Sequence, residues 1–310
     1  YASKSPKDLV DEKVGNCADL NLFAIGLLND VGIEAHPLIL STRDHGKIHV
    51  DYPYSHFFNY VLIMANVDGE INLADATEVM SLNNRIPDRC INDRGLVVQD
   101  GEPQWIHLKC NFPSVIINKI RIVPAADQKM TAHVERSATE YDALKWRRNH
   151  GDDKKSIYKT FEDEHFPISE ASVEVKNLHK KDLPYALEYE AGAGSEMIGD
   201  KIYVSPFLNL VIDHSPLRQE ERTYPIDLIY PRQRSYESEI MLPDGYAIDF
   251  VPEDNEISND LFDLDYTINK MDDRVVVTFG YYFKNPVYQA GDYSKMKYFY
   301  RQIVKKGNEK

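Results

Sequence analysis

Two segments near the N-terminus decide the fold of this chain: GNCADLNLFAIGLLND at residues 15–30 and FFNYVLIMANVDGEINLADAT at residues 57–77. The first segment predicts a helix, because Asn16 is a favourable N-cap, Asp19 lies in the first turn and Gly32 follows the last turn. Cys17 then stands at the N-terminus of a mostly buried helix. There the helix dipole favours a thiolate, and free backbone N–H groups can hold an oxyanion. Such a position is expected of a nucleophilic cysteine.

The second segment predicts a β-hairpin. Two apolar runs flank Asp68-Gly69, a dipeptide that favours a two-residue turn. With such a turn, Tyr60 of the first strand and Asp75 at the end of the second are diagonal neighbours on one face of the hairpin. We therefore expect the Tyr60 hydroxyl to reach the Asp75 carboxylate.

A cysteine on a helix, followed by a strand that ends in Asp-Ala-Thr, resembles the transglutaminase-like superfamily, a branch of the papain-like thiol fold. The local sequence is similar to a subgroup of bacterial envelope proteins whose core is flanked by β-rich domains of unknown function. Later segments of the chain, at 84–95, 199–203, 220–227 and 285–287, also resemble this subgroup. The resemblance implies that Cys17 is the nucleophile and Asp75 the carboxylate of a catalytic triad.

The third member of that triad differs from the family pattern. Where the family carries its histidine, this chain has Tyr60. A tyrosine ionises near pH ~10 and is a poor general base at neutral pH. His56 lies on the same face of the predicted strand, but four residues of extended chain place it about 13 Å from Tyr60. His56 reaches Cys17 only if the chain bends at Ser55-His56.

Composition limits the function further. The 310 residues include 43% hydrophobic and 11% aromatic residues, enough for two or three cores. A formal net charge of −14 argues against nucleic acid as a partner, because such binding depends on phosphate neutralisation. No apolar run is long enough to predict a membrane-spanning helix.

The three cysteines, Cys17, Cys90 and Cys110, form no paired framework. Cys90 and Cys110 are either two buried thiols or one disulfide. Two further groups of candidate metal ligands fit no standard spacing: Asp44, His45, His49 and Asp51 in one loop, and Asp260, Asp263 and Asp265 near a strand. We therefore expect no metal and no cofactor.

The predicted fold class is α+β, with a transglutaminase-like (papain-like) core followed by an antiparallel β-sandwich domain. The core occupies residues 1–100. Residues 101–168 connect it to the second domain through strands and two charged helices, predicted at 138–148 and 154–165. Residues 169–310 form the antiparallel β domain, because short alternating runs recur between Gly, Pro and Asp turns, among them 246–251, 262–269 and 274–282.

Three hypotheses for function follow. The first is a degenerate transglutaminase-like module that binds a peptide or a cell-envelope glycan. The second is an active cysteine peptidase or amidase that uses Cys17 and Asp75 with a base still to be identified. The third is a purely architectural envelope protein. The resemblance also implies a periplasmic or secreted protein, with an N-terminal segment of the same protein packed against this part and its signal peptide lost.

Overall fold

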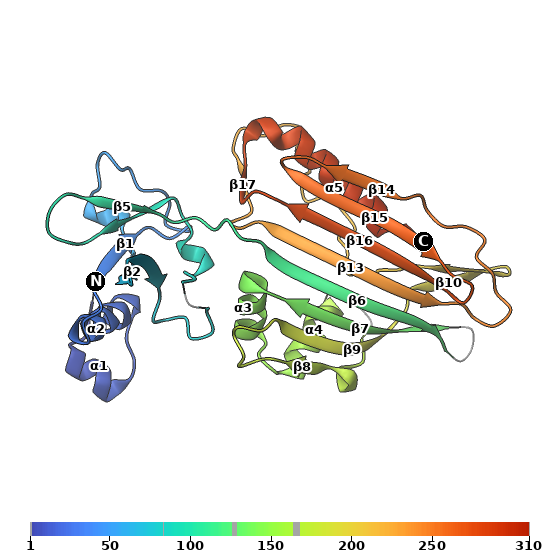
Figure 1. Cartoon of the computed structure of the whole chain (residues 1–310), viewed down its shortest axis with the longest axis horizontal. Coiled ribbons are helices and arrows are strands. Elements are labelled where there is room, and N and C mark those ends of the chain that lie inside the picture. The colour runs from blue at the N-terminus through green and yellow to red at the C-terminus, as the bar shows by residue number, and fades with distance from the viewer. Residues whose placement is uncertain (1, 83, 126–128, 164–167, 310) are drawn as a thin grey trace. The chain divides into compact units, whose positions relative to one another are not determined.

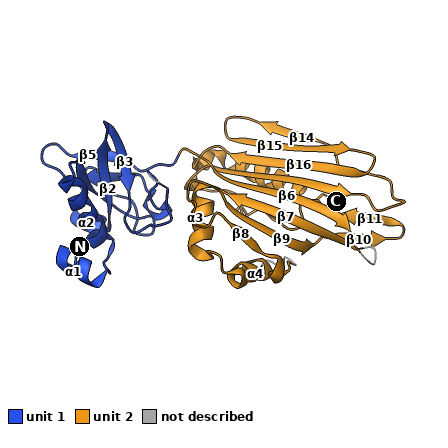
Figure 2. Ribbon diagram, turned by 60° about the horizontal axis from the view of Figure 1, so that its bottom comes forward, with its two compact units in different colours: residues 1–110 blue, residues 111–310 orange. Residues whose placement is uncertain are grey.

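The computed structural model describes residues 2–82, 84–125, 129–163 and 168–309. The chain forms two compact units, Tyr1–Cys110 and Asn111–Lys310, coloured separately in Figure 2. None of the helices in these described ranges is long and apolar enough to cross a bilayer. Each unit has its own sheet, and the two are described in turn (Figure 1).

Unit 1 contains two helices and an antiparallel sheet. The helices are α1 (Pro6–Glu12) and α2 (Cys17–Asp30). The sheet has the strand order β3 (Glu70–Ala74), β2 (Tyr60–Val67), β1 (Ala35–Leu40), β4 (Arg94–Val97) and β5 (Gln104–His107). Two short 3-10 turns, η1 (Ser55–Phe57) and η2 (Asp88–Cys90), lie in the connections. Ile25 of α2 packs on Ala35, Ile63 and Ala65, which fixes the helix against the sheet.

The hairpin of unit 1 confirms the predicted turn. Val67 pairs with Glu70 across Asp68-Gly69. Both turn residues have positive φ, 53° for Asp68 and 85° for Gly69, as a type I′ turn requires. This turn sets the register of β2 against β3, and Asp75 directly follows β3.

Unit 2 is built on one eight-stranded sheet. Its strand order is β14 (Asn255–Ser258), β15 (Phe262–Lys270), β16 (Arg274–Phe283), β13 (Arg232–Met241), β6 (Ser114–Pro124), β7 (Met130–Ala138), β9 (Tyr185–Gly192) and β8 (Glu174–Lys176). All neighbours pair antiparallel except β6 and β13, which run parallel.

The remaining elements of unit 2 are short or helical. The helices are α3 (Glu140–Asn149), α4 (Lys154–Asp163) and α5 (Tyr293–Gly307), with 3-10 turns η4 (Glu170–Ser172) and η5 (Ala290–Asp292). Two separate small ladders pair β10 (Ser195–Ile198) with β11 (Lys201–Val204) and β12 (Ile226–Asp227) with β17 (Val287–Tyr288).

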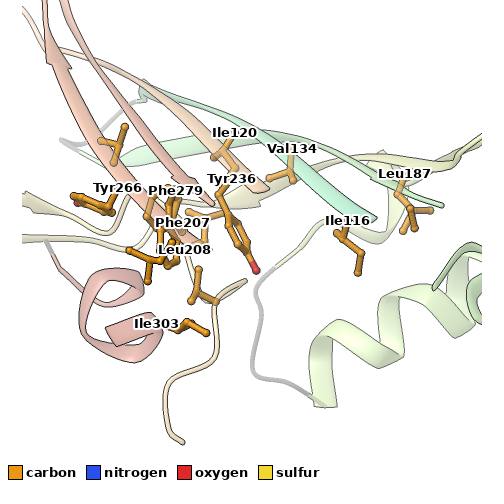
Figure 3. Close-up of a cluster of buried hydrophobic side chains, with 14 of the residues drawn as sticks. Ile116, Ile120, Val134, Leu187, Phe207, Leu208, Tyr236, Tyr266, Phe279 and Ile303 are labelled. Carbon is orange, nitrogen blue, oxygen red and sulfur yellow. The ribbon is translucent and has the colours of Figure 1, made fainter. Parts of the chain in front are cut away.

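One face of the large sheet carries the hydrophobic core. Alternate strand residues such as Ile120, Val134 and Tyr236 point into it. There they meet Ile303 of α5 and Phe207 of the loop after β11 (Figure 3). The opposite face is polar, with cross-strand ion pairs such as Arg121–Glu239 at 3.4 Å. Period-two alternation therefore divides the sheet into one covered and one solvated face.

Several details differ from the sequence-based predictions. The described part of the second domain has one large sheet covered by helices and loops on one face, with two small ladders, and not the predicted β-sandwich. Residues 246–251 form no strand, whereas β10 and β14 were not predicted. The predicted connecting region, 101–168, supplies β6 and β7 to the large sheet, and the compact units divide after Cys110. Helix α4 is described to Asp163, so the last predicted helical residues at 164–165 lie outside the described residues.

Candidate functional site

The first turn of α2 is fixed by a capping box. Asn16 accepts a hydrogen bond from the Asp19 N–H at 3.0 Å, and the Asp19 carboxylate accepts one from the Asn16 N–H at 2.9 Å. Both bonds satisfy backbone donors that the helix leaves open at its start. Cys17 is therefore the first residue of α2, as predicted, and its side chain is partly exposed.

The carboxylate of Asp19 also anchors the N-terminal segment that precedes α1. It accepts hydrogen bonds from the Ser3 N–H at 2.5 Å, the Ser3 hydroxyl at 2.9 Å and the Lys4 N–H at 3.0 Å. The hydrogen bond from Asn16, and those from Ser3 and Lys4, lower the pKa of Asp19 to about 2 although burial opposes them. Asp19 is thus an ionised anchor at the helix start.

Asn21 connects α2 to the hairpin. Its side chain is fully buried; Nδ2 donates to the Val61 carbonyl at 2.9 Å and to Asp75 Oδ1 at 3.0 Å. Its Oδ1 accepts from the Ala76 N–H at 2.8 Å. Residues four apart share one face of a helix, so Cys17 lies one turn from the side chain that holds Asp75.

Asp75 is buried, with only 1% of its side chain exposed, and is held on both oxygens. Oδ1 accepts from the Thr77 N–H at 2.9 Å and from the Thr77 hydroxyl at 2.8 Å, besides Asn21. Oδ2 accepts from the Tyr60 hydroxyl at 2.8 Å. The predicted contact between Tyr60 and Asp75 is therefore present.

The Tyr60 hydroxyl is itself held by a cation. Arg89 Nη2 donates to it at 2.6 Å and lies 3.5 Å from Asp75 Oδ2, and the Arg89 guanidinium carbon lies 5.1 Å from the centre of the Tyr60 ring. Burial is the largest effect on Tyr60 and raises its pKa to about 12, despite the bonds from Thr77 and Arg89. Tyr60 is therefore a neutral phenol whose proton is directed at Asp75, and it cannot accept a proton from a thiol at neutral pH.

Arg89 and Asn21 were not identified from the sequence. Arg89 lies in η2, beside Cys90, within the segment 84–95 that resembles the envelope subgroup. Its neighbour Cys90 is fully buried, and burial raises the pKa of this thiol, with Asp75 and Cys17 adding to the rise and Arg89 opposing it. Cys17, Asp75 and Arg89 therefore lie within electrostatic range of one buried sulfur.

His56 is engaged elsewhere. It lies in η1, where its ring stacks on Tyr54 at 5.8 Å and tilts against Phe57 at 4.3 Å. Its backbone carbonyl accepts a hydrogen bond from His45 Nε2 at 3.0 Å. Within the part of the chain that the structure describes, no hydrogen bond or ion pair joins His56 to Cys17 or Asp75.

The loop groups that were weighed as metal ligands do not converge. Asp44 accepts from the Thr42 hydroxyl at 2.5 Å, and the His49 ring packs on Phe57. Across the described residues, no group of three or more His, Cys, Asp or Glu side chains is placed to hold a metal ion. Cys17, Cys90 and Cys110 are all described, and none of them forms a disulfide.

The site therefore combines a thiol and a carboxylate that α2 connects. Cys17 lies at the helix N-terminus, and one helical turn further along Asn21 holds the buried Asp75 carboxylate. The other oxygen of this carboxylate accepts from a phenol that is paired with a guanidinium. This arrangement holds charged groups and hydrogen bonds in a fixed geometry, and among the described residues no hydrogen bond joins Cys17 to a histidine.

Comparison with known proteins supports the fold at a coarse level. A family described as a domain of unknown function with a solved structure, DUF3858, matches residues 200–310. The crystal structure of a "putative protease" from Parabacteroides distasonis ATCC 8503 is similar over 99% of this chain, with a TM-score of 0.51 and 11% sequence identity. This chain spans 45% of that protein's length. No protein with a curated description matches it in sequence.

Proposed function

We propose that this chain is a transglutaminase-like protein whose site is catalytically degenerate and acts as a peptide- or glycan-binding module. The observation that carries the proposal is the position of Tyr60. Its hydroxyl donates to Asp75 and accepts from Arg89, and its pKa is raised to about 12. The superfamily places a histidine there, and a neutral phenol cannot replace an imidazole as a general base.

The exposed aromatic loop of unit 1 supports binding. Tyr52 and Tyr54 are 66% and 61% exposed, and Tyr54, His56 and Phe57 form a connected set of rings. Large exposed rings on a loop are a common device for recognising the apolar faces of peptides and sugars. The proposal includes a location in the bacterial envelope, periplasmic or secreted, which rests on the sequence resemblance.

A second candidate, an active cysteine peptidase or amidase, is favoured by one observation. Cys17 is partly exposed at the start of α2, on the helix face that also carries the Asn21–Asp75 contact. If another group supplies the base, Cys17 is the nucleophile and Asp75 the orienting carboxylate. The fold similarity to the Parabacteroides protein is compatible with either candidate.

The rate of Cys17 alkylation by iodoacetamide, followed from pH 5 to pH 10 on the full chain, separates the two candidates. Cys17→Ala is the control, because it subtracts the buried Cys90 and Cys110. For a degenerate site we expect a rate that climbs towards the pH near ~8.5 at which free cysteine ionises. We also expect no Cys17-dependent release of amine from casein or from cross-linked peptidoglycan fragments.

A rate that reaches its plateau below pH ~7 would show a thiolate activated by a partner and would contradict the proposal. So would amide hydrolysis that disappears in Cys17→Ala. Conversely, binding of the same peptide or glycan by Cys17→Ala with unchanged affinity would support the binding module, because a binding role does not need the thiol.

A further inference from the structure

Unit 2 contains a pocket that is separate from the Cys17 site. Its volume is about 640 Å³, and it lies between the turn that joins β14 to β15 and the first turns of α5. Figure 1 shows α5 alongside β14 and β15. Volumes of about 300–1,000 Å³ are typical of small-molecule sites. The pocket also lies entirely within the region that matches the domain of unknown function.

The wall formed by the β14–β15 turn is preorganised. Asn259 Oδ1 accepts from the Leu261 N–H at 2.9 Å and the Phe262 N–H at 3.1 Å, and the Asn259 carbonyl accepts from Lys284 Nζ at 2.6 Å. The Leu261 carbonyl accepts from the Tyr288 hydroxyl at 2.8 Å. These hydrogen bonds give polar groups of the turn partners within the protein, and the Asp260 side chain remains exposed at the pocket.

The opposite wall is anchored as firmly. Phe299 of α5 is 4% exposed and stacks on Phe262 at 4.4 Å with an interplanar angle of 14°. Tyr298, the preceding residue, is 50% exposed and lines the pocket together with Ser294, one helical turn earlier. A fixed helix therefore presents a half-exposed aromatic ring to the pocket, with a hydroxyl beside it.

The charges in the pocket disfavour anions and leave one carboxylate without an ion pair among the described residues. Asp292 pairs with Lys295 at 3.3 Å, and in the described chain no ion pair engages Asp260. Two carboxylates repel an anion, and since Lys295 pairs with Asp292, only the single exposed Asp260 carboxylate is left to attract a cation. No set of three or more metal-ligating side chains occurs among the described residues. A neutral ligand that both donates and accepts hydrogen bonds can bond to the carboxylates and to the ammonium.

We propose that this pocket binds a neutral saccharide ring, with the ring's C–H face on Tyr298 and its hydroxyls on Asp260, Ser294 and the Asp292–Lys295 pair. A sugar hydroxyl donates to a carboxylate and accepts from an ammonium at once, so the mixed lining is fully used. The C–H face of a sugar is apolar and packs on an exposed aromatic ring. The site goes beyond the function proposed for unit 1 and does not involve Cys17.

Saturation-transfer NMR on the full chain tests this site. The probes are N-acetylglucosamine, glucose and mannose, each as the monosaccharide and as a tetrasaccharide, with 1,4-diaminobutane and acetate as charged probes. We expect at least one saccharide to bind, and calorimetry to show about tenfold weaker binding to Tyr298→Ala. Asp260→Asn should weaken binding by about threefold, because the amide is a weaker acceptor than the carboxylate.

Tyr224→Ala is the matched control, since Tyr224 is a 77% exposed tyrosine of the same unit outside the pocket lining. Its saccharide affinity should equal the wild-type value. The proposal is overturned if no saccharide binds at concentrations up to about 20 mM, or if Tyr298→Ala binds as tightly as Tyr224→Ala. It is equally overturned if diaminobutane alone binds and Asp260→Asn abolishes that binding.

Discussion

At the residue scale, Tyr60 joins Asp75 of the hairpin to Arg89 of η2. Its hydroxyl lies between an acceptor, Asp75, and a donor, Arg89, so each of its hydrogen-bonding roles is satisfied. A buried carboxylate needs such partners, because desolvation of a charge is costly without them. Asp75 therefore gains a partner for its buried charge, while burial and the neighbouring carboxylate raise the pKa of Tyr60 and keep the phenol neutral.

Removing the Tyr60 hydroxyl should cost stability. In Tyr60→Phe, Asp75 Oδ2 loses its 2.8 Å partner and keeps only the more distant Arg89 at 3.5 Å. We expect the free energy of unfolding to fall by about 1–3 kcal/mol, the usual cost of leaving a buried polar group short of a partner. Urea denaturation followed by circular dichroism measures this, with the 66% exposed Tyr52→Phe as control. Equal midpoints for the two variants would show that the hydroxyl contributes nothing.

The sequence predicted part of this site for a clear reason. The two-residue turn fixes the register, and register alone brings Tyr60 to Asp75. Arg89 reaches the site from η2 through a connection without regular periodicity, so no pattern predicts it. Asn21 could have been found, because it follows Cys17 by one helical turn and is a polar residue within an apolar helical run, where a buried amide needs hydrogen-bond partners. The chemical roles of Cys17, Asp75 and His56 remain predictions.

At the scale of single elements, the start of α2 depends on one carboxylate. Asp19 has a pKa of about 2 in the folded protein, below the value near ~4 of an unfolded aspartate. A carboxyl group with a lowered folded pKa stabilises the fold above the unfolded pKa. That stabilisation is lost as pH falls from about 4 towards about 2, where the carboxylate accepts a proton in the folded state.

Asp19→Asn should therefore destabilise unit 1 at neutral pH and matter progressively less in acid. The variant keeps one acceptor oxygen and replaces the other by an NH2 group, so the Asn16 N–H on one side or the Ser3 and Lys4 N–H groups on the other lose their acceptor. We expect a lower urea midpoint at pH 7 and a gap from wild type that narrows below pH ~4. Asp11→Asn, at an exposed position of α1, is the control and should follow wild type. A gap of constant size between pH 7 and pH 2.5 would rule out the carboxylate charge as the source of the stabilisation.

The elements differ in how well sequence predicted them. Strands with long alternation, such as β15 and β16, were found because one covered face imposes a period of two. Residues 246–251 alternate as well, yet Phe250 is 74% exposed and Asp249 pairs with Lys201. The alternation there comes from isolated exposed aromatic side chains, and these residues do not line one face of a sheet. β10 and β14 have four residues each, too few for a periodic signal.

At the scale of the whole molecule, the decisive contact in unit 2 is the parallel pairing of β6 with β13. Ser114 lies opposite Arg232 and Ile122 opposite Ile240, so residues more than a hundred positions apart share a ladder. No local pattern encodes such a pairing, which explains why the sequence assigned 101–168 to a connecting region. In the structure β6 and β7 are central strands, and β13 is paired on both sides.

The pairing predicts where the chain can be divided. A fragment of residues 111–310 retains all eight strands of the large sheet, and we expect it to fold with a cooperative urea transition. A fragment of residues 169–310 lacks β6 and β7, so β13 becomes an open edge and the inner face loses Ile116, Ile120 and Val134 from its core. An apolar sheet with a free edge aggregates, so this fragment should be insoluble or oligomeric in size-exclusion chromatography. A soluble, monomeric 169–310 fragment with a cooperative transition would mean that the core of unit 2 does not depend on the β6–β13 ladder.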